Sequence, residues 1–154
     1  MKQLNMLVAI CLSSVSLAAQ ACTYDGQFSN PFTESYPGSL DVAMSTYDAL
    51  DSQTIDTISS LNGPSGLRRA SWWLKLMADK YASELQSVSY IYLVDSHLWS
   101  KVEHGQSITV HSAPSDDSSS SRVLLLSEAA LNALVQGKVS FEQGVTLGVI
   151  HKAG

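Results

Sequence analysis

The chain has 154 residues, of which 45% are hydrophobic and 15% are charged, and its 14 acidic against 9 basic side chains give a formal net charge of -5 at pH 7. This length fits one domain with a hydrophobic core of its own. The negative charge disfavours contact with the phosphates of nucleic acid or with anionic lipid headgroups, so we expect no nucleic acid partner.

Residues 1–21 contain the three parts of a secretory signal peptide. Lys2 supplies the positive charge, residues 4–17 form an apolar run, and Ala19-Gln20-Ala21 matches the small-x-small site that a signal peptidase cleaves. The run is shorter than the ~20 residues of a transmembrane helix, and no later stretch reaches that length. We therefore expect an exported, periplasmic protein with no transmembrane segment in the mature chain.

Cleavage after Ala21 would make Cys22 the first mature residue. Cys11 would leave with the signal peptide, so Cys22 would be the only thiol and no internal disulfide could form. Two interpretations stay open. Cys22 is either the first residue of a soluble periplasmic protein or the lipid-bearing residue of a membrane-anchored bacterial lipoprotein. The soluble interpretation leads, because lipoprotein signals usually place Leu, Val or Ile where this chain has Ala19.

An aromatic N-terminal arm, residues 22–37, precedes the main domain at 38–154. Its prolines and its Asn-Pro step disfavour regular structure. Its four aromatic side chains are nevertheless too apolar for a disordered tail. We expect this arm to pack against the domain.

Apolar spacing predicts two helices at the start of the domain. Ser39 can cap the first helix, whose apolar residues three and four positions apart predict one stripe that faces the core. This stripe contains Leu40, Ala43, Met44, Tyr47 and Leu50. A short second helix is predicted around Ile55 and Ile58, before the turn residues of 62–66.

The clearest helix prediction covers residues 67–86. Its apolar residues share about one quarter of the helix circumference, so this face must belong to the core. They are Leu67, Ala70, Leu74, Met77, Ala78, Tyr81 and Leu85. Trp72 and Leu76 lie away from this stripe, so the helix is either sandwiched between two layers or presents an apolar patch. We favour the sandwich, because large apolar patches are uncommon on monomers.

Three strands are predicted in the middle of the chain. Residues 88–95 are rich in Tyr, Ile and Val, and both faces are apolar, which indicates a central strand. Residues 97–103 are predicted to form a connection, and a second strand follows at 108–111. A flexible Ser/Asp loop at 112–121 leads to the third strand at 122–126, whose continuous apolar run indicates burial on both faces.

Two Ser-capped helices and a last strand complete the pattern. Ser127 and Gly137 fit the two ends of the first helix, Ser140 and Gln143 have the spacing of a capping box, and the last strand begins at Val149. The sequence therefore predicts an α+β fold. We expect a single small domain with a small, mostly antiparallel sheet of about four strands packed against helices.

This closing pattern resembles the end of sterol carrier protein-type lipid-binding domains. The residues that carry the resemblance are Ser127, Leu131, Leu134, Gly137, Ser140, Gly148, Val149, Ile150 and Gly154, about a fifth of the chain. The resemblance implies a shell of helices and strands around an apolar tunnel that holds a fatty acyl chain, a sterol or a similar molecule. It also implies that the domain is not catalytic.

No spacing of side chains predicts catalysis or a metal site. The chain lacks a Gly-x-Ser-x-Gly nucleophile turn, a phosphate-binding glycine loop and a pair of redox cysteines. His97, His104 and His111 recur every seven residues, but a strand end, a loop and a strand would give them no common face. Asp95 has no partner that its spacing indicates. We therefore expect no enzymatic activity, no cofactor and no metal.

The function expected from these features is the binding of an apolar ligand, a lipid or an acyl chain, in the bacterial envelope. The expected ligand-binding residues are Trp72, Leu76, Met77, Tyr90, Tyr92, Phe141 and Val145. The alternative is a periplasmic interaction or accessory module that binds another envelope protein through an exposed aromatic patch, such as Trp72 or the arm. A lipoprotein anchored through Cys22 remains a further alternative.

Overall fold

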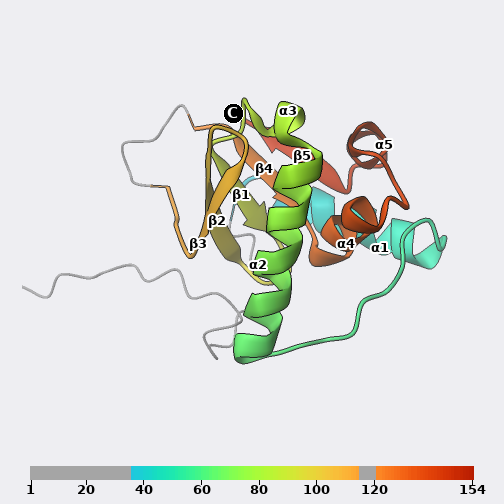
Figure 1. Cartoon of the computed structure of the whole chain (residues 1–154). Coiled ribbons are helices and arrows are strands. Elements are labelled where there is room, and N and C mark those ends of the chain that lie inside the picture. Colours follow the sequence, from blue (N-terminus) through green and yellow to red (C-terminus); the bar gives the residue numbers. More distant parts are fainter. Residues whose placement is uncertain (1–35, 115–120) are drawn as a thin grey trace, which may run out of the picture.

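The computed structural model describes residues 36–114 and 121–154 (Figure 1). The predictions for the signal peptide, for Cys22, for the arm up to residue 35 and for positions 115–120 of the Ser/Asp loop lie outside the described residues.

The described strands form one mixed sheet. They are β1 (Tyr90–Leu93), β2 (Leu98–Glu103), β3 (Ser107–Val110), β4 (Val123–Leu126) and β5 (Ile150–Ala153). Their order is β3-β2-β1-β4-β5, in which β1 and β4 run parallel and the other neighbours antiparallel. The predicted α+β class and the central first strand are confirmed. The predicted connection at 97–103 is wrong, because all of these residues except His97 form β2. The polar residues Ser100 and Lys101 interrupt the apolar pattern of this strand, although Ser100 is fully buried.

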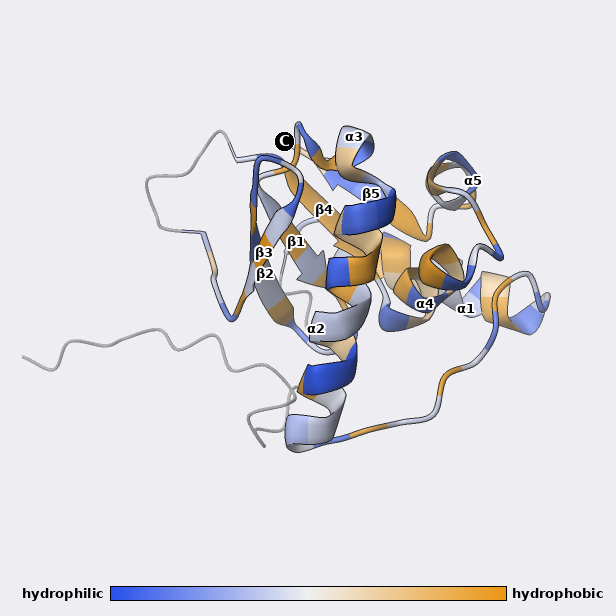
Figure 2. Ribbon diagram, in the orientation of Figure 1, coloured by the Kyte–Doolittle hydropathy of each residue, from blue (hydrophilic) through white to orange (hydrophobic). Residues whose placement is uncertain are grey.

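Helices cover both faces of the sheet. They are α1 (Ser39–Asp51), α2 (Gly63–Lys80), α3 (Ala82–Leu85), α4 (Glu128–Gln136) and α5 (Phe141–Thr146). Leu124 and Leu126 of β4 belong to the larger core, with residues of α2 and α4, whereas Leu125 belongs to a smaller core with Val42 of α1. Alternate strand residues point to opposite faces, so α1 lies on the opposite side of the sheet from α2 and α4. The apolar colour of β4 reflects this burial on both sides (Figure 2).

The predicted orientation of the first helix is wrong. Gly38, in a left-handed conformation, occupies the cap position instead of Ser39, and the buried residues of α1 include Val42, Thr46 and Ala49. Thr46 fixes this orientation, because its hydroxyl donates a buried 3.0 Å hydrogen bond to the Ser127 hydroxyl. Four residues of the predicted core stripe, Leu40, Ala43, Met44 and Tyr47, therefore face solvent, whereas Leu50 packs against the larger core.

Two further helix predictions need correction. Residues 56–62 contain no helix and form an extended strap between α1 and α2, anchored at its start by the buried Ile55 (Figure 1). The next helix, α2, begins at Gly63, because Asn62 takes the cap position and Pro64 fits the first turn. The sandwich predicted around α2 is also wrong, since Trp72 on its outer side is 57% exposed.

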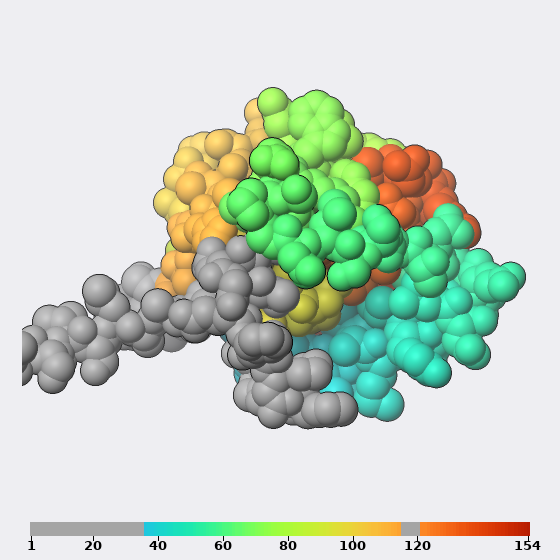
Figure 3. All heavy atoms as spheres, turned by 90° about the horizontal axis from the view of Figure 1, so that it is seen from below, coloured from blue at the N-terminus to red at the C-terminus, as the bar shows by residue number. Residues whose placement is uncertain are grey.

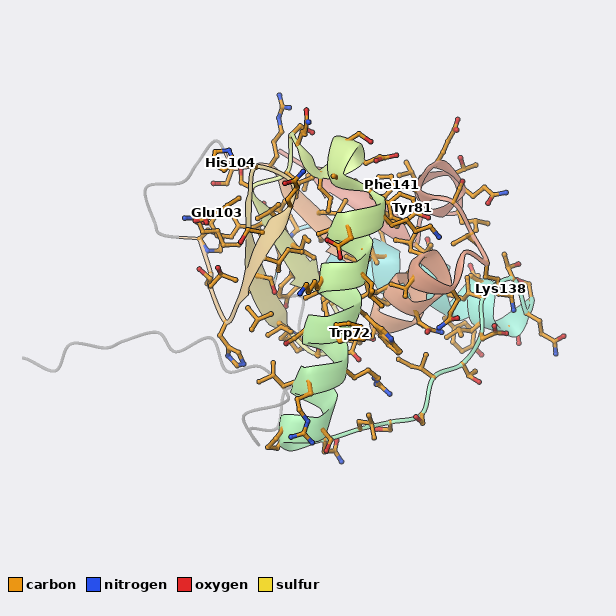
Figure 4. The ribbon with its side chains drawn as sticks, in the orientation of Figure 1. Trp72, Tyr81, Glu103, His104, Lys138 and Phe141 are labelled. Carbon is orange, nitrogen blue, oxygen red and sulfur yellow. The ribbon has the colours of Figure 1, made fainter. Side chains whose placement is uncertain are left out.

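The seven-residue recurrence of three histidines has a conformational explanation. His97, His104 and His111 all have left-handed backbones, with φ of 54°, 54° and 59°. His97 lies in the turn between β1 and β2, His104 lies with Gly105 in the turn between β2 and β3 (Figure 4), and His111 follows β3. Histidine tolerates this conformation better than β-branched residues do. The repeat therefore marks successive ends of strands and does not bring the three rings together.

The closing helices follow their predicted boundaries. The Ser127 hydroxyl accepts a hydrogen bond from the backbone N–H of Ala130, and the capping box of Ser140 and Gln143 is complete. Gly137 ends α4 in the left-handed conformation that its position predicts. Among the described residues, no helix has the length and apolar character needed to cross a membrane.

Candidate functional site

The seven residues expected to bind an apolar ligand do not form one site. Met77 and Tyr92 are fully buried, but Met77 lies in the larger core and Tyr92 in the smaller core on the other face of the sheet. Tyr90 borders the smaller core, and Phe141 packs against Tyr81 with ring centroids 5.8 Å apart (Figure 4). The remaining three residues lie at the surface. They are Trp72 and Val145, which are exposed, and Leu76, which is partly buried.

The core beside α2 has no free space around its central residues. Leu74, Met77, Leu124 and Leu131 have an exposed fraction of 0%. A cavity that could hold even one water molecule would give accessible area to the side chains around it. In this conformation these four residues therefore contact only protein.

A polar recess lies where two parallel strands end. β1 and β4 are neighbours in the sheet, so the segments that follow them, Asp95-Ser96 and Ser127-Glu128, emerge at the same edge. The strap and α2 complete the recess, which has a volume of about 260 Å³. Its lining residues are Ile58, Ser59, Ser60, Leu61, Asn62, Arg69, Asp95, Ser96 and Glu128. We call these nine residues the polar recess.

Arg69 connects three walls of the polar recess. Its guanidinium donates to the Glu128 carboxylate over 3.1 Å and to the backbone carbonyl of Ser59 over 2.6 Å. It also lies over the ring of Trp73, 4.9 Å from the ring centroid, in a cation–π contact. The side chains of Arg69 and Glu128 are only 15% and 5% exposed, so this ion pair is largely shielded from water. Arg69 thereby holds the strap, α2 and the start of α4 together.

Asp95 supports the N-terminus of α4. Both of its carboxylate oxygens accept from the backbone N–H of Glu128, at 3.1 and 3.0 Å. Glu128 is the first residue of α4, where the free N–H groups and the helix dipole favour a negative charge. Next to Asp95, the hydroxyl of Ser96 is buried without a hydrogen-bond partner among the described residues. Such a group is a feature that a bound ligand can complete.

The electrostatics of the polar recess disfavour its negative charges. Burial raises the pKa of Glu128 from its ordinary value of 4.5 to about 7, even though Arg69 donates to this carboxylate. Desolvation of the carboxyl group also raises the pKa of Asp95, although the residue as a whole is exposed. The N–H groups that bond to Asp95 and the charge of Arg69 act in the opposite direction on its pKa. Two carboxyl groups thus accompany a single guanidinium, and desolvation raises the pKa of both.

The described part of the chain contains no group of three or more His, Cys, Asp or Glu side chains arranged to hold a metal ion. A separate polar pair lies on the smaller-core face, where the Tyr92 hydroxyl and the His97 ring nitrogen Nδ1 are 2.6 Å apart. Burial lowers the pKa of His97, which favours the neutral ring.

Comparisons with protein-family models, with curated proteins and with solved structures found no match to this chain. The resemblance to sterol carrier protein-type domains therefore stays a prediction from the sequence.

None of the residues of the polar recess was among the expected ligand-binding residues, although two of them carried a signal. Asp95 and Glu128 each follow closely on a buried apolar strand, and acidic residues at that position often line the carboxyl edge of a parallel pair. The signal was incomplete, because the sequence does not reveal that β1 and β4 are neighbours. Nothing in its local pattern marks Arg69, which comes from the middle of an amphipathic helix.

Proposed function

We propose that this protein is a non-catalytic binding domain, and that its polar recess takes a small molecule that carries a primary amine next to a hydroxyl or carbonyl oxygen. The observation that carries this proposal is the charge balance of the recess, in which Asp95 and Glu128 accompany the single cation Arg69. A ligand ammonium would supply the positive charge that the recess lacks. Asp95 is its expected partner, because Glu128 already pairs with Arg69.

Size and composition favour a small polar ligand. Ligand pockets for drug-sized molecules typically measure ~300–1,000 Å³, and the recess, at about 260 Å³, lies just below this range. Seven of its nine lining residues are polar. The unpartnered hydroxyl of Ser96 beside Asp95 matches a ligand oxygen close to the amine. The lipid or acyl ligand expected from the sequence finds less support in this lining.

The existing bonds of the two carboxyl groups favour binding over catalysis. A general acid or base must exchange a proton with its substrate, and so needs freedom to reach it. Asp95 instead accepts from the start of α4, and Glu128 accepts from Arg69. Both contacts hold the walls of the recess in place. This is the arrangement expected of a preformed binding site.

A titration of the folded protein with small probes tests the proposal. We would follow ¹H–¹⁵N NMR spectra while adding ethanolamine, with ethylene glycol as the neutral probe and acetate as the anionic probe. We expect saturable shifts around Asp95 and Glu128 with ethanolamine only. Binding near neutral pH should also release a proton, because an added cation lowers the pKa of Glu128.

Two variants separate the ligand contact from helix capping. Asp95→Asn removes the charge but also weakens the support of α4, whereas Ser127→Ala weakens the same helix start without changing the charge of the recess. We expect Asp95→Asn to weaken ethanolamine binding about tenfold, or about 1.4 kcal/mol, and Ser127→Ala to leave it unchanged. Equal binding of acetate, equal loss in both variants, or chemical conversion of the probe would contradict the proposal.

A further inference from the structure

An apolar face of α1 is exposed to solvent. Leu40, Met44 and Tyr47 are 57%, 60% and 70% exposed. Positions four and three apart share one side of a helix, so these side chains form a continuous strip. Ala43, between them on the same side, is also exposed. We call these four residues the α1 strip.

The opposite side of α1 is firmly attached to the domain. Val42 packs in the smaller core, and Thr46 donates its buried hydrogen bond to Ser127. Gly148, before β5, approaches so closely that a Cβ atom there would lie 2.6 Å from the Ser45 hydroxyl oxygen. Rotating α1 to bury the strip would break these contacts. The outward direction of the α1 strip is therefore part of the folded structure, not a loosely held helix.

Exposure of this strip calls for a partner. A surface helix normally buries its apolar residues and turns its polar residues to water. Contiguous exposed apolar patches mark interaction sites on soluble proteins, and an amphipathic helix with apolar residues at this spacing commonly binds in a groove. The end of α1 and the segment after it project at one side of the molecule (Figure 3).

The charges of α1 define the chemistry of the partner. Asp41, Asp48 and Asp51 are exposed. At 100° per residue, Asp41 and Asp48 follow one border of the α1 strip, and Asp51 lies in line with the strip at the end of the helix. The helix contains no Lys or Arg. A second copy of this chain would bring two such acidic borders together, and an anionic membrane would repel them. A protein groove with an apolar floor and a basic rim matches both the strip and its border.

We propose that the α1 strip binds an apolar groove, rimmed by Lys or Arg, on a partner protein. This interaction is independent of the polar recess. It assigns the expected role of an interaction module to α1 and not to Trp72. Burial of the strip supplies the affinity, and the aspartates orient the helix in the groove.

Site-specific photocrosslinking in the native host tests this assignment. The full chain would carry benzoylphenylalanine at Met44 or, as the control, at Lys75, which is exposed on α2. We expect one protein adduct from position 44 that is absent from position 75. Mass spectrometry of the joined peptides should place the contact in a partner segment with apolar residues and with Lys or Arg. A crosslink to lipid, to a second copy, to residues 22–35 of the same chain, or no specific crosslink would overturn the proposal.

The affinity for the purified partner is then measured for matched variants. We expect Met44→Ser to weaken binding at least tenfold, while Trp72→Ser, which removes an equally exposed apolar side chain from α2, leaves it within about twofold. Asp48→Lys should slow association and reduce its salt dependence, whereas Glu142→Lys on α5 should not. Circular dichroism confirms that each variant is folded. Loss of binding with Trp72→Ser but not with Met44→Ser would overturn the assignment to α1.

Discussion

Replacing Glu128 with Gln should change how the stability of this protein depends on pH. Glu128 is 4% exposed, and its pKa is raised by burial from 4.5 to about 7. Gln has nearly the same shape and can still accept a hydrogen bond from Arg69, but it cannot ionise. The variant therefore isolates the cost of a buried negative charge.

The direction in which the stability changes with pH follows from the raised pKa of Glu128. Between pH 4.5 and 7 the unfolded chain has lost the Glu128 proton while the folded protein retains it. The stabilising contribution of the neutral carboxyl is therefore complete below pH 4.5, declines as the pH rises, and is lost above pH 7. Each unit of pKa difference corresponds to ~1.36 kcal/mol, so the decline amounts to about 3 kcal/mol. Glu128→Gln should be free of this decline.

Urea unfolding, monitored by tryptophan fluorescence over a pH series, measures the effect. From pH 4.5 to about pH 8, the free energy of unfolding of Glu128→Gln should rise by about 3 kcal/mol relative to the wild type, at unchanged m-value. Glu142→Gln, on the exposed side of α5, is the control for replacing a carboxyl. A constant difference, or a wild type that gains on the variant as the pH rises, would refute the reasoning. The ion pair with Arg69 would then stabilise the Glu128 carboxylate by more than desolvation destabilises it. The polar recess would in that case not lack positive charge.

Three further predictions concern turns, caps and the partly buried His97. Gly105→Ala should destabilise the protein by ~2 kcal/mol or more in thermal unfolding, because the φ of Gly105 is +71° and a Cβ atom there would lie 2.6 Å from a backbone carbonyl oxygen of α3. Gly63→Ala is the control and should cost only ~1 kcal/mol, because the φ of Gly63 is +55° but a Cβ atom there would meet no other atom within 4 Å. Ser127→Ala should cost ~2 kcal/mol and Ser140→Ala ~1 kcal/mol in urea unfolding, because both serines cap a helix but only the first is buried and also accepts a second hydrogen bond. Burial lowers the pKa of His97 from 6.5, so the contribution of the neutral ring to stability should be present above pH 6.5 and decline as the pH falls below it. His97→Asn should lack this decline, because Asn tolerates the left-handed backbone but does not ionise. An identical dependence of stability on pH in both proteins would contradict this prediction.

Several features were predictable because they depend on residues close together in the chain. The cap of α4 joins Ser127 to the N–H three residues later, and the capping box joins Ser140 to Gln143. Gly137 ends α4 because glycine adopts the left-handed backbone without steric cost. The apolar residues on both faces of β1 similarly indicated a strand covered on both sides. Such signals need no knowledge of the rest of the fold.

The direction of α1 and the polar recess depend on contacts between distant residues. The spacing of apolar residues correctly indicated one stripe on α1, but periodicity does not specify which side of a helix the domain covers. That side was decided by Thr46 and Ser127, which are 81 positions apart and bond only in the folded protein.

The amino-acid sequence by itself determined the α+β class, the central strand and the ends of the last two helices, because hydrogen bonds and packing preferences within a few residues specify them. Only the tertiary structure decided that Arg69, Asp95 and Glu128 meet in one recess. Their convergence follows from the parallel pairing of β1 and β4 and from the packing of α2 against α4. Local patterns record neither of these contacts, since each joins segments that lie far apart in the chain and close together only after folding.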